Sequence, residues 1–349
     1  MATTTISSYD TMTGKLWAEK FFRKMGFETV VDKLMVEGDN GIISVKRELE
    51  KADGDRVRFH IFNELGGEFV RGSTSLEGQE QKLTHAYQDV ILEEYKLGVR
   101  VKNGIDMKRA IFPISKIAEE RLKLQIAKNI DKLWFEKMFE GTLTKQLYAG
   151  AATSLADLAA TDVLSFESCS KAKYGAISGW QTTNQTVNLE PFRPVRIDGG
   201  EYFVVLTHPY AVYSLVNSAA YQMLMREARE RGKENPIFSG AVAILDNVII
   251  KTSNFVPLLT TTNGITYAKS LFLGSQASCW AWGQQLEIIN KAFGYNEEEG
   301  WGGRLIMQPA RTKFTNSLPA STTDVPPSNT VYDYACAQFN IACTNLGTA

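Results

Sequence analysis

The chain has 349 residues and is close to neutral, with 38 lysines and arginines against 39 aspartates and glutamates. Hydrophobic residues make up 44% of it, enough for a large core in one large or two modest domains. The balance of charge excludes the basic footprint of a nucleic-acid-binding domain, and three histidines supply few metal ligands or general bases.

The N-terminus is rich in threonine and serine and lacks the apolar core of a secretory signal. The sequence contains no run of about 18 apolar residues, so no membrane span is predicted. The cysteines form no CxxC pair and no zinc spacing with the histidines, so we expect buried, reduced thiols in a cytosolic setting. They are Cys169, Cys279, Cys336 and Cys343.

The segment KLWAEKFFRKMGF, residues 15–27, predicts a short amphipathic helix. Trp17, Phe21 and Phe22 give it an aromatic face that so short a helix cannot bury by itself. We therefore expect this helix to dock onto another part of the molecule or onto a neighbour.

A hairpin arm is predicted next. Residues 54–62 alternate apolar and polar side chains, as a half-buried strand does, and the alternation returns in 95–102. An excursion of about 20 residues between two strands is uncommon inside a compact domain and is usually functional or disordered. The arm is too polar to form its own core, so it needs support from outside. The glycines of the excursion are Gly66, Gly67, Gly72 and Gly78.

The sequence LGGEFVRGSTSLEG, residues 65–78, comes close to a phosphate-binding loop. Such a loop needs a lysine before its Ser/Thr, and this chain has Ser73 there. It must also open directly onto a helix, whereas Thr74 is followed by SLEGQEQKL, which has no apolar helical stripe. We therefore predict no nucleotide site and no cofactor.

Residues 111–141 give the strongest helix pattern in the chain. Apolar side chains follow one another at spacings of three and four from Leu122 to Met138, and Gly141 favours a stop. About 26 residues at 1.5 Å each predict a rod about 39 Å long.

The second half of the chain mixes strands with short helices. The predicted elements are a helix within 155–174, either continuous or broken at Thr161, two strands around a DGG turn in 194–209, a helix opening at Pro209, a helix in 218–233, a strand at 247–253, a strand in 270–285 followed by a small-residue turn or short helix, a returning strand at 304–314, a linker at 317–330 and a last strand in 331–343.

His208 precedes Pro209 at a predicted strand-to-helix turn, where catalytic residues often lie. No GxSxG or HExxH motif accompanies it, which favours a structural turn residue over a catalytic histidine. The acidic run at 297–299 lacks the alternating spacing of a calcium loop and favours a solvated loop. The sequence thus predicts no catalytic or metal-binding residue and favours a structural assembly subunit over an enzyme.

Five segments, in order, resemble the major capsid proteins of tailed bacteriophages, in the branch typified by short-tailed N-four-like phages. They are DNGIISVKRELEKADGDRVRFHIFNELGG (39–67), VRGSTSLEGQEQKL (70–83), HPYAVYSL, NPIFSGAVAILDNVII and LFLGSQAS. The resemblance covers about residues 15–315. The chain departs from it at Ser73, where we expect an acid, and in GYNEEEGWG (294–302), which lacks an expected aspartate.

This resemblance implies an α+β tailed-phage major capsid fold, the Hong Kong phage-type shell fold. Its expected parts are an N-terminal arm at 1–55, an extended β-hairpin loop at 56–101, a peripheral domain at 102–174 and 304–349 with spine helix 111–141, and an axial domain at 175–303. The glycine-rich tip then lies across an adjacent subunit, with Arg71, Glu77 and Glu80 positioned to pair across the seam. The implied interface residues are Trp17, Phe21, Phe22, Gly66, Gly67, Arg71, Gly72, Glu77, Gly78 and Glu80.

The resemblance also implies a function: self-assembly, as hexamers and pentamers, into an icosahedral shell around the phage genome. The implied locations are the virion capsid and, during synthesis, the host bacterial cytoplasm. Implied partners are portal, scaffolding and decoration proteins and packaged double-stranded DNA bound without sequence specificity, with no membrane. The loop tip has no lysine nearer than Lys82 at its base, so we expect no isopeptide cross-links. The alternatives are a cytosolic enzyme of unidentified chemistry and a decoration or scaffold-like binding protein.

Overall fold

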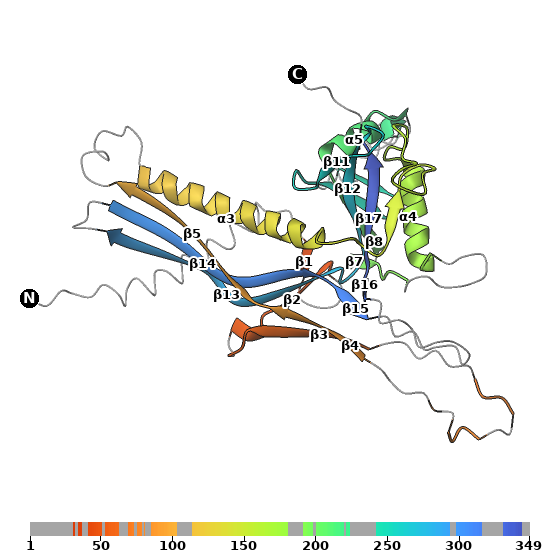
Figure 1. Cartoon of the computed structure of the whole chain (residues 1–349), viewed down its shortest axis with the longest axis horizontal. Coiled ribbons are helices and arrows are strands. Elements are labelled where there is room, and N and C mark those ends of the chain that lie inside the picture. The colour runs from red at the N-terminus through yellow and green to blue at the C-terminus, as the bar shows by residue number, and fades with distance from the viewer. Residues whose placement is uncertain are drawn as a thin grey trace, which may run out of the picture.

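A long, curved sheet of five strands forms one half of the molecule (Figure 1). The two longest strands, β13 and β14, pair antiparallel, and β14 also pairs antiparallel with β5. On the other side, β2 pairs parallel with both β13 and β1. The order is β1 (Met35–Val36), β2 (Ile43–Lys46), β13 (Ser278–Phe293), β14 (Glu298–Arg311) and β5 (Glu93–Lys102).

The computed structural model describes part of the chain. The described residues are 31, 34–36, 41–50, 53–62, 69–72, 75–78, 80, 85–102, 114–180, 191–197, 200–219, 221–223, 242–293, 298–315 and 331–343. The helices predicted at 15–27 and, beyond residue 223, in 218–233 lie outside these residues, as do the linker at 317–330 and the site residues Trp17, Phe21, Phe22, Gly66 and Gly67.

Helix α3 (Ile114–Met138) lies along one face of the five-stranded sheet (Figure 1). Its buried Trp134 donates a hydrogen bond from Nε1 to the Ser278 hydroxyl at 3.1 Å. The fully buried indoles of Trp280 and Trp282 stack on each other in the same core, 5.7 Å between ring centroids. These large aromatic side chains fill the space between helix and sheet, and their burial stabilises both. The helix predicted at 111–141 is confirmed over the residues described.

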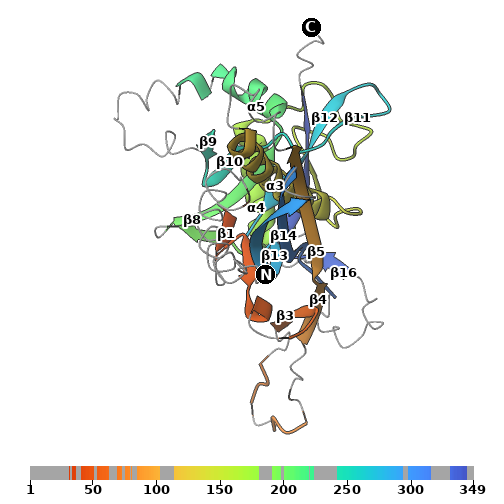
Figure 2. The ribbon, with the colours of Figure 1, turned by 90° about the vertical axis from the view of Figure 1, so that its left-hand side faces the viewer.

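The opposite face of the sheet carries the hairpin of β3 (Arg56–Phe62) and β4 (His85–Ile91), with the short 3-10 helix η2 (Glu48–Glu50) beside it (Figures 1 and 2). Alternation along β13 explains this third layer, since Cys279 and Ala281 face away from the helix core. They pack in a separate cluster with Val57, Phe59 and Val90 of the hairpin. Helix, sheet and hairpin therefore form three layers that share β13.

An eight-stranded sheet forms the other half of the molecule, with two helices packed beside it (Figure 2). The helices are α4 (Phe166–Ser178) and α5 (Pro209–Val216). The strand order is β6 (Gln146–Tyr148), β17 (Cys336–Ala342), β12 (Thr266–Leu273), β8 (Gly200–Thr207), β10 (Val248–Thr252) and β9 (Ala243–Leu245), with β11 (Leu258–Thr260) on β12 and β7 (Val195–Ile197) on β8. A two-stranded ribbon of β15 (Lys313–Thr315) and β16 (Val331–Asp333) lies near the junction of the two halves.

Most predicted elements of this half are present. Strands β7 and β8 pair antiparallel, as the two strands predicted in 194–209 do, α5 opens at Pro209, and β10 and β17 fall within the predicted strands. The helix predicted within 155–174 is displaced, because α4 begins only at Phe166. The Asp162 carboxylate accepts hydrogen bonds from the backbone N–H groups of Ala159 and Ala151, which holds the chain before Ser165 in turns. Ser165 then caps α4 through a capping box.

Within 270–285, the predicted strand is the end of β12 and is followed by a turn at residues 274–277, the first of the two predicted alternatives. The sequence analysis did not predict that the long strand β13 begins directly after this turn, at Ser278. The predicted hairpin arm needs correction. The partner of β3 is β4, whereas the alternating residues 95–102 belong to β5 and pair with β14. A backbone hydrogen bond from Leu92 N–H to the Asp55 carbonyl closes the hairpin before β5 begins. Strand β5 pairs with β14, and β13 pairs with β2 and β14. Several of these partners are far away in sequence, and local periodicity does not reveal them.

The predicted domain boundaries do not coincide with the sheets. The boundary at 303/304 falls inside β14, and the one at 101/102 falls inside β5. Strand β13, expected in the axial domain, pairs with β2 and β14, while β17, expected in the peripheral domain, pairs with β12. The chain therefore crosses between the two sheets more often than the predicted domain boundaries imply.

A buried ion pair stands where the two halves meet. Arg311 Nε, at the end of β14, lies 2.6 Å from Asp333 Oδ1, and both side chains are 2% exposed. A second guanidinium nitrogen, Nη1, donates to the Met138 carbonyl at the C-terminus of α3. The second carboxylate oxygen of Asp333 accepts from the Thr144 N–H at 2.7 Å and from its hydroxyl. One ion pair thus links α3, β14 and β16.

We expect Asp333→Ala to lower the free energy of unfolding by about 3–5 kcal/mol, because it leaves the Arg311 charge buried without its partner. Urea unfolding of the unassembled subunit measures the change. The matched control is Arg311→Met with Asp333→Leu, which removes both charges and should recover much of the loss. A loss below about 1 kcal/mol for the single variant would contradict the importance given to this pair.

Candidate assembly surface

The inner face of the hairpin is attached to its own chain. Val57 and Val90 are buried against the sheet, and the Gln88 side chain forms two hydrogen bonds to neighbouring backbone. Its Nε2 donates to the Arg311 carbonyl at 2.9 Å, and its Oε1 accepts from the Lys313 N–H at 2.8 Å. Farther along, Ala86 packs with Phe314 of β15. The support that the arm was predicted to need therefore comes, at its base, from β13, β14 and β15 of the same chain.

The outer face of the hairpin is polar, aromatic and exposed. Directly opposed residues of the two strands form cross-strand pairs on this face, among them Arg58 with Asp89 and His60 with Tyr87. Arg58 donates from Nε and Nη2 to the two carboxylate oxygens of Asp89, at 2.6 and 2.8 Å, and its guanidinium lies 4.1 Å from the centre of the Tyr87 ring. These hydrogen bonds hold the pKa of the Asp89 carboxyl below its usual value. These contacts hold the side chains of the cross-strand pairs in a defined arrangement on the exposed face.

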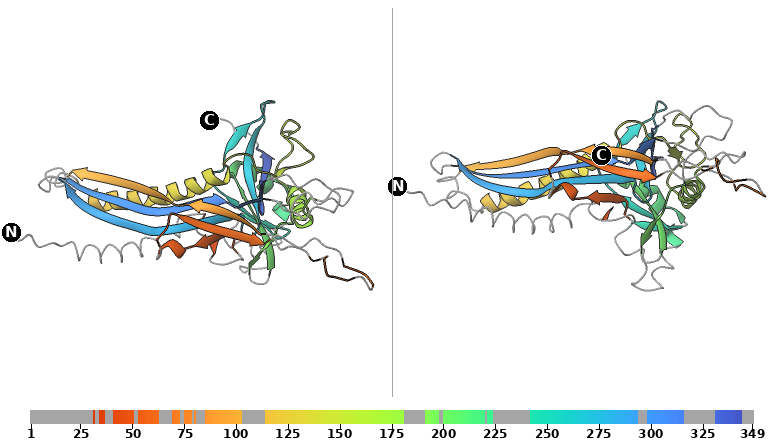
Figure 3. Two further views of the ribbon diagram at one scale, coloured as in Figure 1. Left: turned by 60° about the horizontal axis from the view of Figure 1, so that its bottom comes forward. Right: turned by 90° about the horizontal axis from the view of Figure 1, so that it is seen from below.

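The described residues of the tip between β3 and β4, 69–72, 75–78 and 80, project from the body of the molecule (Figure 3). All of them are exposed except Val70, which is half-buried. Phe69 is 97% exposed and Leu76 is 63% exposed. Gly72 and Gly78 adopt φ angles of 76° and 85°, which glycine adopts without strain. The Glu80 carboxylate accepts from the Gly78 N–H at 2.7 Å, which fixes the turn. The described residues of the tip thus form a projection with exposed apolar and acidic side chains.

Half of the predicted site residues belong to the part of the chain that the structure describes. Arg71, Gly72, Glu77, Gly78 and Glu80 lie together on this tip and are all exposed. Their pairing across a subunit seam stays a prediction. The sequence analysis did not include the two apolar tip residues, although Phe69 and Leu76 stand in a polar stretch too short to bury them. Two large apolar side chains in a short polar segment are the sequence feature from which this candidate contact surface could have been predicted.

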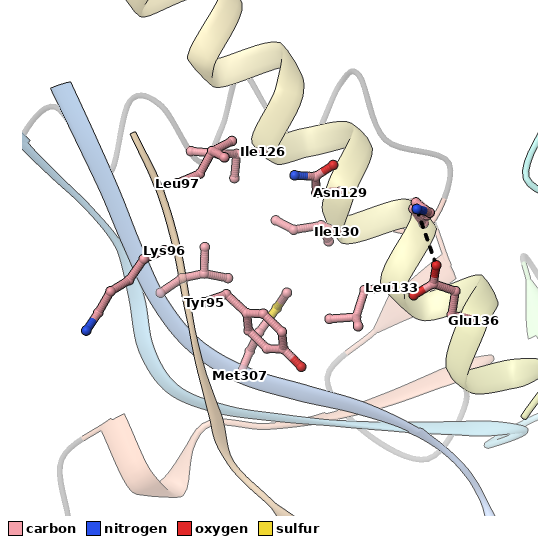
Figure 4. Close-up of a pocket in the computed structure, with 11 residues that line it drawn as sticks. Tyr95, Lys96, Leu97, Ile126, Asn129, Ile130, Leu133, Glu136 and Met307 are labelled. Carbon is pink, nitrogen blue, oxygen red and sulfur yellow. Dashed lines mark ion pairs between the residues drawn. The ribbon is translucent and has the colours of Figure 1, made fainter. Parts of the chain in front are cut away.

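The surface clefts outside the tip include three that are lined by described residues. The spine groove, about 330 Å³, runs between α3 and the sheet (Figure 4). Its floor is apolar and its rim carries an ion pair between Lys132 and Glu136 at 3.5 Å. The hairpin cleft, about 300 Å³, includes Asp89, Glu93 and Glu140 beside basic residues. The floor residues of the spine groove are Leu97, Ile126, Ile130, Leu133, Leu305 and Met307.

The third cleft, named here the α4 cleft, measures about 390 Å³ and lies between α4 and strand β6. Its lining includes Lys145, Tyr148, Lys171 and Trp180. The Lys145 ammonium lies 4.9 Å from the centre of the Trp180 ring, and burial lowers the pKa of this lysine. The sequence analysis did not identify this cleft, because β6 and α4 come together only through the eight-stranded sheet.

The histidine and cysteines that the sequence analysis considered as catalytic or metal-binding residues occupy a helix cap and buried sites. His208 is the N-cap of α5, where its Nδ1 accepts from the Tyr210 N–H at 3.2 Å, and burial lowers its pKa. All four cysteines are free and buried, as predicted, and burial raises their pKa values, for Cys169 and Cys279 to about 12. The described residues include no group of three or more His, Cys, Asp or Glu side chains placed to hold a metal ion. Among them, too, no helix is long and apolar enough to cross a membrane.

The family model described as phage capsid protein matches residues 5–150 and 139–324. The chain belongs to this phage capsid family. It is a structural protein of a phage shell, located in the virion capsid. The predicted phage capsid family is thereby confirmed, whereas the N-four-like branch and the absence of catalytic residues stay predictions. The likeness to solved capsid structures confirms the predicted fold class.

Individual relatives agree with this assignment. The major capsid protein of Pseudomonas phage KPP25 is 23% identical over 345 residues, covering 88% of this chain and 92% of that protein. The capsid of Ralstonia phage GP4 has the same fold, with a TM-score of 0.73 at 23% identity over 89% of this chain and 90% of that one. The acidic stable capsid of Helicobacter pylori bacteriophage KHP30 gives 0.70 at 13% identity, covering 90% and 91%.

We expect Gln88→Ala to loosen the hairpin from its own subunit, because two backbone groups lose their partner at a cost of about 1–3 kcal/mol. Hydrogen exchange of the β4 amides in the unassembled subunit should become at least about fivefold faster. Tyr87→Thr, on the exposed face of the same strand, is the control and should leave most of the protection in place. Unchanged exchange in Gln88→Ala would show that other contacts hold the arm.

Proposed function

We propose that this protein is the major capsid protein of its phage. Copies assemble as hexamers and pentamers into the icosahedral shell that encloses the double-stranded DNA genome. The observation that carries the proposal is the hairpin: its base is docked on its own chain, while its tip exposes Phe69 and Leu76 to solvent. An apolar projection of this kind in a shell protein is suited to contact a neighbouring copy.

The energetics of the tip support the same reading. Fixing a residue's backbone costs about 1–2 kcal/mol, and the exposed tip buries almost none of its own apolar surface in return. Covering Phe69 or Leu76 at an interface contributes about 1.5–3 kcal/mol for each side chain. Repetition of that contact through the shell makes the tip a major contributor to assembly. Arg71, Glu77 and Glu80 would then form the polar rim of the contact.

The parts of the molecule receive proposed roles. The five-stranded sheet with α3 is the peripheral domain and its spine, and the eight-stranded sheet is the axial domain. The β3–β4 hairpin with its tip is the extended loop, and the N-terminal arm lies within residues 1–55. Portal, scaffolding and decoration proteins are further proposed partners, with DNA packaged without sequence-specific contacts and synthesis in the host cytoplasm.

We expect the purified protein to form closed shells, visible by negative-stain electron microscopy and as a fast-sedimenting fraction. Phe69→Ser with Leu76→Ser should reduce that fraction severalfold, because the loss repeats at every copy. The melting temperature of the unassembled subunit should stay within about 1 °C, since both side chains are exposed.

Leu259→Ser is the matched control, since Leu259 is also exposed (43%) but lies on β11, away from the hairpin. It should assemble like the wild type. A wild-type protein that stays monomeric under all assembly conditions, with or without a scaffolding protein, would refute the proposed function.

A further inference from the structure

We propose that the α4 cleft is the receptor for the hairpin tip of a second copy of this chain. This inference rests on the proposed function, and it adds which surface of the neighbour receives the tip. Four observations carry it: the charge of the cleft, the state of Lys145, the composition of the tip and the open edge of β6.

The charge of the lining distinguishes the α4 cleft from the other two. It contains Lys145 and Lys171 and no acidic side chain. The spine groove carries Glu136 on its rim, and the hairpin cleft carries three acidic residues. Of these three clefts, the α4 cleft is therefore the one whose charge attracts an acidic segment.

Lys145 is in a state that favours an incoming carboxylate. Its side chain is half-buried, no ion pair connects it to a described carboxylate, and its contact is with the ring of Trp180. Desolvation lowers the pKa of this lysine. A carboxylate placed beside a partly desolvated ammonium stabilises its charged form. Trp180 adds an aromatic surface, a residue type common at the centres of interfaces.

The tip has the complementary composition. Residues 63–83 contain four glutamates against Arg71 and Lys82. Glu77 and Glu80 are exposed beside the apolar Leu76 and Phe69. The outer surface of α4 offers apolar contacts next to the cleft, since Tyr174 is 61% exposed and Ile177 is 48% exposed.

The backbone of β6 provides a further contact. Strand β6 is the last in the strand order of its sheet and pairs with β17 through the Lys145 carbonyl and the Ala149 N–H. Because alternate residues of a strand face opposite sides, Gln146 and Tyr148 direct their N–H and C=O groups away from β17. Such an edge accepts an extended segment by strand addition.

The occupant is a second copy because the tip projects away from its own body (Figure 3). The inner face of the hairpin is fixed on β13 and β14, and Phe69, Leu76 and Glu77 of the tip are exposed in the single chain. A contact between the tip of one copy and the α4 cleft of another leaves every copy with one donor and one acceptor surface.

Cross-linking between two single-cysteine variants tests this contact directly. Glu77→Cys and Lys145→Cys are purified separately, mixed, assembled and treated with a short bismaleimide. We expect covalent dimers in the mixture and none with either variant alone. The native cysteines do not interfere, because all four are buried with raised pKa values.

Lys132→Cys, on the rim of the spine groove, replaces Lys145→Cys in the control mixture and should give no dimers. Equal dimer yield in both mixtures, or shells without dimers between positions 77 and 145, would overturn the inference while the proposed function stands. Wild-type protein that forms no shells refutes the proposed function instead.

A charge exchange gives a second measure that does not depend on cysteine. Lys145→Glu should lower the assembled fraction about tenfold, and so should Glu77→Lys with Glu80→Lys. The three substitutions combined in one chain should restore most of it, which a folding defect does not explain. Loss in each variant without restoration in the combination would also overturn the inference.

Discussion

The buried ion pair between Arg311 and Asp333 lies where described segments of the chain cross between the two sheets. Around it, three crossing segments hydrogen-bond to one another: Thr312 N–H to the Ala277 carbonyl, Gly274 N–H to the Ala335 carbonyl, and Thr144 to the Asp333 carboxylate. The guanidinium also accommodates the Met138 carbonyl at the end of α3. Two charges out of water require this full set of partners, so the pair fixes how helix, sheets and ribbon meet. The orientation of one half relative to the other follows from it.

Strand β13 extends that constraint to the assembly surface. Its indoles face α3, and its small side chains at Cys279 and Ala281 leave room for the hairpin on the other face. The base of the hairpin is therefore rigid, which sets the direction in which the tip projects. A rigid base lowers the entropy lost when the tip binds, so the interface needs less contact energy than a free loop would.

Local sequence patterns predicted the elements that depend on local physics. Helix α3, the pairing of β7 with β8 and the alternation of β3 follow from periodicity and from the turn residues between strands. They failed where partners far away in sequence decide: β5 alternates like a hairpin strand, yet it pairs with β14. Asp162 shows a second limit of local prediction. Its buried carboxylate accepts hydrogen bonds from backbone N–H groups and holds residues before 165 in turns, where helix propensity favours a helix. The acidic tip was visible in sequence, whereas the basic cleft formed by Lys145 and Lys171 was not, because β6 and α4 meet only in the folded chain.

A neutral chain can still carry strong directional electrostatics when its charges are separated in space. Here glutamates lie on the tip, and Lys145, which forms no ion pair with a described carboxylate, lies in a cleft of the other half, so like ends of two copies repel and unlike ends attract. A tip-to-cleft contact is heterologous, with different surfaces on the two copies, and such contacts close into rings when the rotation between copies permits. Rings of five and six differ by a small change in that rotation. A tip that turns on Gly72 and Gly78, at the end of a rigid hairpin, places the necessary freedom at the contact itself.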